Sequence, residues 1–155
     1  MRLMMVARRY PPDFRSGTER VFENLYRQAR KHHDVRLVVG YTQARDRVPA
    51  EAIPVDLRGL SNVACWPAML KAALREEKRF RPDVVLGNSI DVMTLKTPLV
   101  CIVHDLNFGK HRASMANKMK VTLHQIRSRF SKSWVTVSHS AKRSFEEAGV
   151  RPKAF

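Results

Sequence analysis

One histidine occupies a position suited to chemistry. His104 comes directly after the apolar run of residues 99–103 and has Asp105 beside it. An imidazole titrates near neutral pH and both donates and accepts hydrogen bonds, so it can orient or protonate a reacting group. A histidine at a strand end can equally serve only to hydrogen-bond a neighbouring loop, and position alone does not separate the two roles. His104 is the catalytic candidate, and Asp105 is a candidate cleft residue.

Other polar residues come after the remaining apolar runs and are candidates to line the same cleft: Arg8, Arg9, Arg15, Asn88 and Ser138. In an open parallel sheet, ligands bind beyond the carboxyl ends of the strands, where these residues would converge. Ser138 has a second interpretation, since no GxSxG elbow surrounds it and a serine before a helix commonly caps that helix.

A helix start follows the first run. Ser16-Gly17-Thr18-Glu19 has the pattern of a capping box, in which Ser16 caps the helix and Glu19 reaches back. The free N–H groups and the dipole of a helix N-terminus favour anions. Ser16 and Gly17 are therefore candidates for contact with a phosphate group, although Gly17 taken alone is more typical of a plain helix entry.

The elements that must position these residues alternate along the chain. Nearly unbroken apolar runs at 3–7, 35–39, 84–86, 99–103 and 134–137 predict strands that are buried on both faces. Apolar residues at helical spacing predict helices at 17–31, from about Pro67 to 80, at 115–130 with a buried stripe of Met115, Met119, Leu123, Ile126 and Phe130, and at 140–148 before Gly149. Residues 42–54 are predicted to be a flexible excursion. This order favours a single α/β domain, a doubly wound parallel sheet.

Several ligand motifs are missing from the sequence. It contains no GxGxxG, no acidic residue at the ribose-binding position at the end of the second strand and no GxxxxGK[ST], which disfavours NAD binding and a P-loop NTPase. Neither HExxH nor CxxC occurs, and His32-His33 is better explained as a helix end. We expect no metal and no bound cofactor.

The charge is strongly positive, with a formal net charge of +15 over 155 residues. Residues 106–145 contain nine Lys or Arg and no acid. At 44% hydrophobic residues the chain can still bury a core, and no run is long enough to span a membrane. We expect a cytoplasmic protein. The charge would attract nucleic acid, an anionic membrane surface or a phosphorylated ligand, and composition does not choose among them.

The order of the motifs resembles a known family. The opening RLMMVARRYPPDFRSGTERVFENLYRQARKHHDVRLVVGY, then RPDVVLGNS, LVCIVHDLNFG and WVTVSHSAKRSFEEAGV, resemble the N-terminal half of retaining, glycogen-synthase-like glycosyltransferases of the GT-B fold. The resemblance implies that residues 1–155 form a Rossmann-like, acceptor-side domain. It also implies that the domain holding most of the nucleotide-sugar lies outside this chain.

Roles for individual residues come from this resemblance. His104 matches a strand-end histidine near the transferring sugar, and Ser16 and Gly17 match a glycine-rich turn near the donor diphosphate. The family often has two glycines there, so the serine leaves the close backbone approach in doubt. The implied partners are a nucleotide-sugar, a glycan or lipid-linked acceptor, a second domain or subunit, and an anionic membrane surface with which a cytoplasmic protein would associate peripherally. The alternative function is a basic binding module for nucleic acid or a membrane surface; specific nucleic-acid binding is not expected, because no RNP, GXXG or zinc motif occurs.

Overall fold

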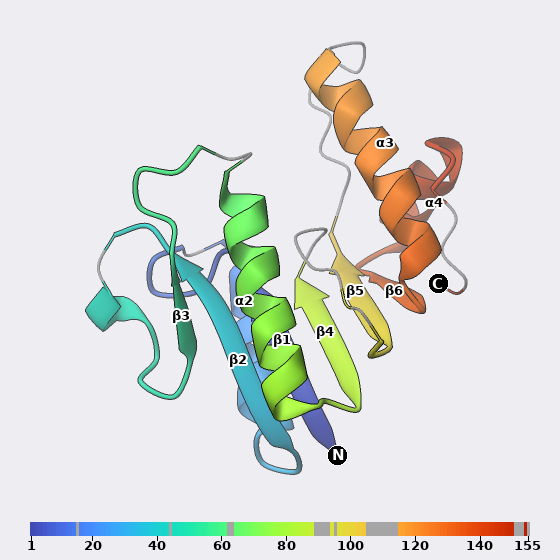
Figure 1. The fold of residues 1–155 in the computed structure, drawn as a ribbon. Helices are drawn as coiled ribbons and strands as arrows, with labels where there is room; N and C mark the ends of the chain where they lie inside the picture. The colour runs from blue at the N-terminus through green and yellow to red at the C-terminus, as the bar shows by residue number, and fades with distance from the viewer. Residues whose placement is uncertain are drawn as a thin grey trace.

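The protein is a three-layer α/β domain in a computed structural model, which describes residues 1–14, 16–43, 45–61, 64–88, 94, 96–104, 115–150 and 154. Six parallel strands form one sheet in the order β3-β2-β1-β4-β5-β6 (Figure 1). The strands are β1 (Arg2–Ala7), β2 (Asp34–Tyr41), β3 (Ile53–Asp56), β4 (Val84–Asn88), β5 (Leu99–Val103) and β6 (Ser133–Thr136). This is the doubly wound, Rossmann-like sheet that the sequence predicts.

The described helices are α1 (Gly17–Ala29), α2 (Cys65–Phe80), α3 (Met115–Phe130) and α4 (His139–Glu147), with a short 3₁₀ helix, η1 (Arg45–Arg47). Successive side chains of β1 point to opposite faces of the sheet and belong to two separate core clusters. Met4 and Val6 belong to the cluster that contains Met69 of α2, whereas Met5 belongs to the cluster that contains Phe22 of α1. The two helices therefore cover opposite faces of the sheet, and α2 crosses its front in Figure 1.

Local signals explain where the helices begin and end. Pro67 lies in the first turn of α2, where its missing N–H costs nothing. Ser138 caps α4, because its Oγ accepts a hydrogen bond from the Ala141 N–H at 3.1 Å. Gly149 ends that helix at a φ of +72°, a conformation that glycine adopts without a Cβ penalty. These three predictions are confirmed.

The prediction of a flexible excursion at residues 42–54 is wrong in part. That segment contains η1 and the first two residues of β3. The sequence analysis predicted five strands and did not identify β3. Pro54 lies inside β3, and a proline is tolerated there because β3 is an edge strand.

The predicted apolar stripes also differ from what the helices bury. On α3, Ile126 is 46% exposed, while His124 and Ser128 are buried. Of the other residues predicted for that stripe, the side chains of Met115, Met119, Leu123 and Phe130 lie outside the described part. On α1, Phe22 and Tyr26 are buried but Val21 and Leu25 are exposed. Helical spacing identifies a face, and the packing decides which edge of that face is covered.

Candidate active site at the strand ends

The carboxyl ends of the central strands bring three of the predicted site residues together. Ala7, the last residue of β1, is the register partner of Asn88, the last residue of β4. Asn88 is in turn the partner of Ile102 in β5. Arg8 and His104 directly follow β1 and β5, and neighbouring strands lie about 4.8 Å apart. Arg8, Asn88 and His104 thus lie on three adjacent strand ends, which we call the strand-end site.

Each side chain of the strand-end site is partly withdrawn from water. Asn88 is 6% exposed, and its buried Oδ1 has no hydrogen-bond partner among the described residues. His104 and Arg8 are half-buried, with the His104 Nε2 and the Arg8 Nε fully covered. A cation, an amide and an imidazole in a low-dielectric setting interact strongly with an anionic or hydroxyl-rich ligand.

The site lies where the chain changes direction across the sheet. From β1 the chain continues through α1 to β2 on one side, and β4 leads to β5 on the other side. In open α/β sheets this switch point is the usual ligand crevice. Three of the strand ends that the sequence analysis selected, those of β1, β4 and β5, are therefore neighbours in the sheet.

The first turn of α1 is occupied by its own cap. The Ser16 N–H donates to Glu19 Oε2 at 3.1 Å, and the Ser16 hydroxyl donates to the same carboxylate. Among the described residues no hydrogen bond is recorded for the N–H groups of Gly17 and Thr18, so these amides are the donors left at the helix start. A Cβ on Gly17 would meet nothing within 4 Å, so open space adjoins this backbone.

The remaining predicted site residues are placed as follows. Arg9 is exposed, and its Cζ lies 5.2 Å from the ring centroid of Phe14 in the same loop. Ser138 lies past β6, and its hydroxyl oxygen is engaged in the α4 cap. Arg15 and Asp105 lie outside the described residues.

The loop between β1 and α1 is held by residues that the sequence analysis missed. Asp13 Oδ2 accepts hydrogen bonds from the Thr42 N–H at 2.6 Å, the Thr42 hydroxyl at 3.0 Å and the Gln43 N–H at 3.3 Å. The Pro-Pro-Asp turn is a local signal for such a residue, but its partner lies 29 positions away. Asp13 therefore fastens the loop that carries Arg8 and Arg9 to the end of β2.

Gly40 of β2 keeps that strand close to the start of the same loop. A Cβ at this position would lie 2.6 Å from the Arg8 carbonyl oxygen and would also overlap the Leu57 side chain. Only glycine permits this approach, so Gly40 helps to set the backbone that leads into the strand-end site.

Tyr10 packs the loop between β1 and α1 against α1. It is buried and packs edge-on against Tyr26 of α1, with ring centroids 6.4 Å apart. Burial raises the pKa of the Tyr10 phenol well above its ordinary value, and the nearby Glu23 carboxylate raises this pKa further. Tyr10 therefore stays neutral and acts as a packing residue.

The described residues contain neither a candidate metal site nor a candidate membrane span. No group of three or more His, Cys, Asp or Glu side chains there could hold a metal ion. None of the helices in the described part has the length and apolar character that a bilayer crossing needs.

Comparison with known proteins gives a family and a fold. The family model described as Glycosyltransferase Family 4 matches residues 15–154. No curated protein matches the chain significantly. Solved structures do match over the full chain, and all of those described next are 12–15% identical, a level that shows the fold alone.

Two of these structures are UDP-GlcNAc 2-epimerases. The one from Methanocaldococcus jannaschii is 13% identical with a TM-score of 0.65, and the one from Rickettsia bellii is 12% identical with a TM-score of 0.67. A third is HepE from Anabaena, solved in complex with UDP and glucose, at 15% identity and a TM-score of 0.62. The chain covers 45%, 44% and 43% of these structures respectively, so it spans less than half their length.

Proposed function

The chain belongs to glycosyltransferase family 4, and from this premise we propose that it forms the N-terminal, acceptor-side half of a two-domain glycosyltransferase. Such an enzyme transfers a sugar from a nucleotide-sugar to an acceptor in the cytoplasm. The observation that carries the proposal is the strand-end site, where Arg8, Asn88 and His104 lie at three adjacent strand ends at the switch point of the sheet. The coverage of less than half of the similar structures supports a second domain that holds most of the donor.

In the proposed reaction, the bond between the anomeric carbon and the diphosphate oxygen breaks and the nucleoside diphosphate leaves. The acceptor hydroxyl oxygen bonds to the anomeric carbon, and its proton passes to an oxygen of the departing diphosphate. Negative charge grows on the departing diphosphate, and the Arg8 guanidinium together with the Gly17 and Thr18 amides would stabilise it. The cap formed by Ser16 and Glu19 would hold those amides in place.

His104 and Asn88 would bind the sugar that moves. The His104 imidazole would orient a hydroxyl of that sugar, and its dipole would help to stabilise the positive charge that develops at the anomeric carbon. The Asn88 Oδ1, which lacks a partner among the described residues, would accept a hydrogen bond from a hydroxyl of the ligand. We propose that no resident metal or cofactor takes part, because the sequence contains no DxD motif.

Transfer assays test the proposal that this chain is one half of a two-domain enzyme. We expect no transfer from UDP-, GDP- or ADP-sugars by the 155-residue chain alone, and transfer once it is joined to the second domain. Turnover by the chain alone at the rate of the joined protein would contradict the proposal.

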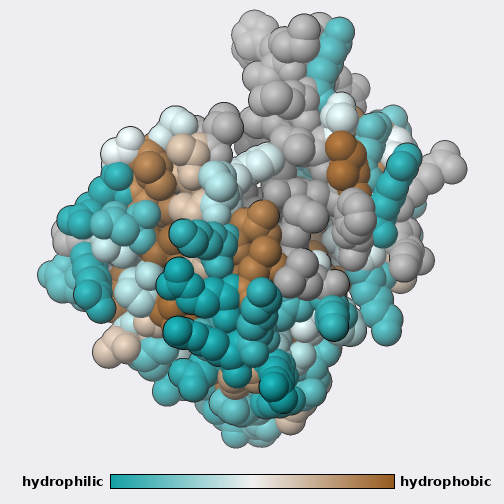
Figure 2. All heavy atoms as spheres, viewed as in Figure 1, coloured by the Kyte–Doolittle hydropathy of each residue, from teal (hydrophilic) through white to brown (hydrophobic). Residues whose placement is uncertain are grey.

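One helix face supports an anionic membrane as a partner. Lys71, Arg75 and Lys78 of α2 are exposed on the rim of a groove of about 480 Å³, whose floor contains the half-buried Leu70 and Leu74. Figure 2 shows hydrophilic side chains gathered beside an apolar patch on the face that α2 covers. We propose that this face docks peripherally on anionic lipid headgroups, close to a lipid-linked acceptor.

Vesicle cosedimentation tests this docking. Each basic residue near an anionic surface is worth about 1 kcal/mol, so we expect Lys71→Glu with Arg75→Glu to weaken binding to phosphatidylglycerol vesicles more than tenfold. The matched control is Arg129→Glu on α3. Equal binding to phosphatidylcholine vesicles would refute the electrostatic docking, and sequence-selective RNA or DNA binding at about 150 mM salt would favour the nucleic-acid alternative.

A further inference from the structure

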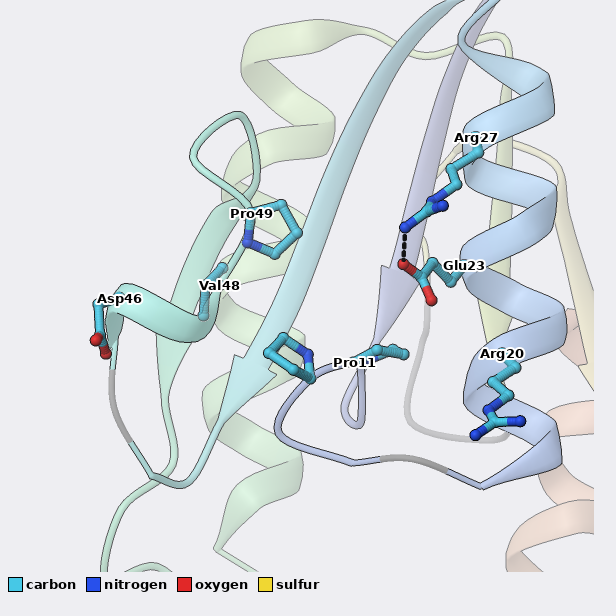
Figure 3. Close-up of a pocket in the computed structure, with 8 residues that line it drawn as sticks. Pro11, Arg20, Glu23, Arg27, Asp46, Val48 and Pro49 are labelled. Carbon is cyan, nitrogen blue, oxygen red and sulfur yellow. Dashed lines mark hydrogen bonds and ion pairs between the residues drawn. The ribbon is translucent and has the colours of Figure 1, made fainter.

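A second cavity lies beside α1, between that helix and the connection from β2 to β3. Its volume is about 670 Å³, within the range of small-molecule sites. One wall is Arg20, Glu23 and Arg27 of α1, and Pro11 lies at the base (Figure 3). Pro12 also lines the cavity. We call this cavity the α1 groove.

The opposite wall of the α1 groove is Asp46, Val48 and Pro49. These three residues also line an adjoining cavity of about 400 Å³ that continues to Pro54 in β3. Because the two cavities share these lining residues, they lie next to each other.

Hydrogen bonds fasten the two walls of the α1 groove to each other. Near the base, Asp13 ties the loop to Thr42 at the end of β2. Farther along α1, the Tyr26 hydroxyl donates to Glu51 Oε1 at 3.3 Å, and the Arg30 guanidinium forms an ion pair with the same carboxylate. The groove is therefore preformed, which lowers the ordering cost of binding.

The polar groups of the groove are balanced in charge. Arg27 Nη2 is paired with Glu23 Oε1 at 2.6 Å. Arg20 and Asp46 have no ion pair among the described residues. Two guanidinium groups and two carboxylates cancel in formal charge, yet they supply both donors and acceptors. A strongly anionic ligand would meet the two carboxylates, and a purely apolar one would leave all four groups desolvated.

The apolar parts of the lining are flat and aliphatic. Pro11, Pro12, Val48 and Pro49 present C–H surfaces among these charged groups. A sugar ring has the matching chemistry, with hydroxyls at its edge and C–H groups on its faces. We propose that the α1 groove binds a neutral oligosaccharide, and, resting on the function proposed above, that this is the part of the acceptor glycan distant from the reacting hydroxyl.

The path between the groove and the strand-end site is short in the chain. Arg8 follows β1 at the strand-end site, and Pro11 and Pro12, which line the groove, come three and four residues later. A glycan seated in the groove would therefore continue over this one loop toward His104. Acceptor length would then affect KM, since distal rings add binding energy away from the reacting atoms.

The test is a titration of the nitrogen-15-labelled chain with maltopentaose, mannopentaose and a β-linked galactopentaose, followed by NMR. We expect at least one of them to shift the amides of residues 20–27 and 46–49. Arg20→Ala should weaken this binding about tenfold, because a guanidinium that bonds ring hydroxyls is lost. Arg20→Gln, which keeps one donor group, should weaken it less, and Arg129→Ala on α3 is the matched control.

Three outcomes would overturn the inference: no response to any of the three oligosaccharides, shifts elsewhere in the chain, or shifts of the groove amides with inorganic phosphate alone. The function proposed above is tested separately by adding UDP, which should shift the amides of Gly17, Thr18 and Asn88. A saccharide response without a UDP response would leave the groove standing as a glycan site and would count against the role of the strand-end site.

Discussion

Removal of the Asp13 carboxylate should loosen the loop that leads into the strand-end site. This carboxylate accepts two hydrogen bonds from Thr42, at 2.6 and 3.0 Å, and a longer one from the Gln43 N–H at 3.3 Å. All three join the β1–α1 loop to the end of β2. The change to test is Asp13→Ala, with Asp13→Asn as the milder variant.

The magnitude follows from the number and the setting of these bonds. A hydrogen bond to a charged group contributes about 1.5–3 kcal/mol, and solvent competes for a carboxylate that is only half-buried. Counting the two bonds to Thr42 and discounting for solvent, we expect Asp13→Ala to lower the free energy of unfolding by about 2–3 kcal/mol. Asp13→Asn keeps an acceptor oxygen and loses the charge, so about half of that loss is expected.

Urea denaturation followed by circular dichroism measures this change. A loss of that size lowers the midpoint by about 1–2 M urea. Asp34→Ala is the matched control, because Asp34 is an exposed carboxylate at the start of β2. A change below about 0.5 kcal/mol for Asp13→Ala, the scatter of ordinary surface substitutions, would refute the role assigned to this residue.

Other predictions concern the same elements. Gly40→Ala should destabilise the fold by about 1–3 kcal/mol in urea denaturation, because its Cβ would overlap the Arg8 carbonyl oxygen; an unchanged midpoint would contradict this. Ser138→Ala should cost about 1 kcal/mol through loss of the α4 cap and leave kcat of the joined enzyme unchanged, so a fall in kcat would give Ser138 a direct role. Because the folded-state pKa of Tyr10 is raised above the unfolded value of about 10, stability should be full below that pH and fall as the pH rises above it; pH-dependent denaturation of wild type against Tyr10→Phe measures this slope, and equal slopes would argue against it.

Much of the fold could be predicted from the sequence because buried parallel strands form nearly unbroken apolar runs. The runs at β1, β2, β4 and β5 are largely apolar, and the helices α1, α2 and α4 have local start or stop signals at Ser16, Pro67 and Gly149. The strand β3 was not predictable in the same way. It has four residues, includes Pro54, and reaches its place only by pairing with β2.

The candidate site, too, could be predicted from the sequence only in part. The placement of Arg8, Asn88 and His104 at the same edge of the sheet follows from a general rule about the carboxyl ends of parallel strands, so a sequence with located strands predicts it. The bond from Asp13 to Thr42 and the bond from Tyr26 to Glu51 join segments 29 and 25 residues apart. Such contacts depend on how loops pack, and no local pattern encodes them. The α1 groove, which these bonds hold open, therefore becomes visible only in the folded chain.

The most direct test of the proposed function is sugar transfer by the chain joined to its second domain, compared between wild type and His104→Ala. The matched control is His139→Ala, because His139 is an exposed histidine at the start of α4. We expect His104→Ala to lower kcat by about a hundredfold or more while the urea midpoint stays within the range of surface substitutions, and His139→Ala to leave kcat unchanged. Transfer by His104→Ala at the wild-type rate would contradict the placing of the reaction at the strand-end site.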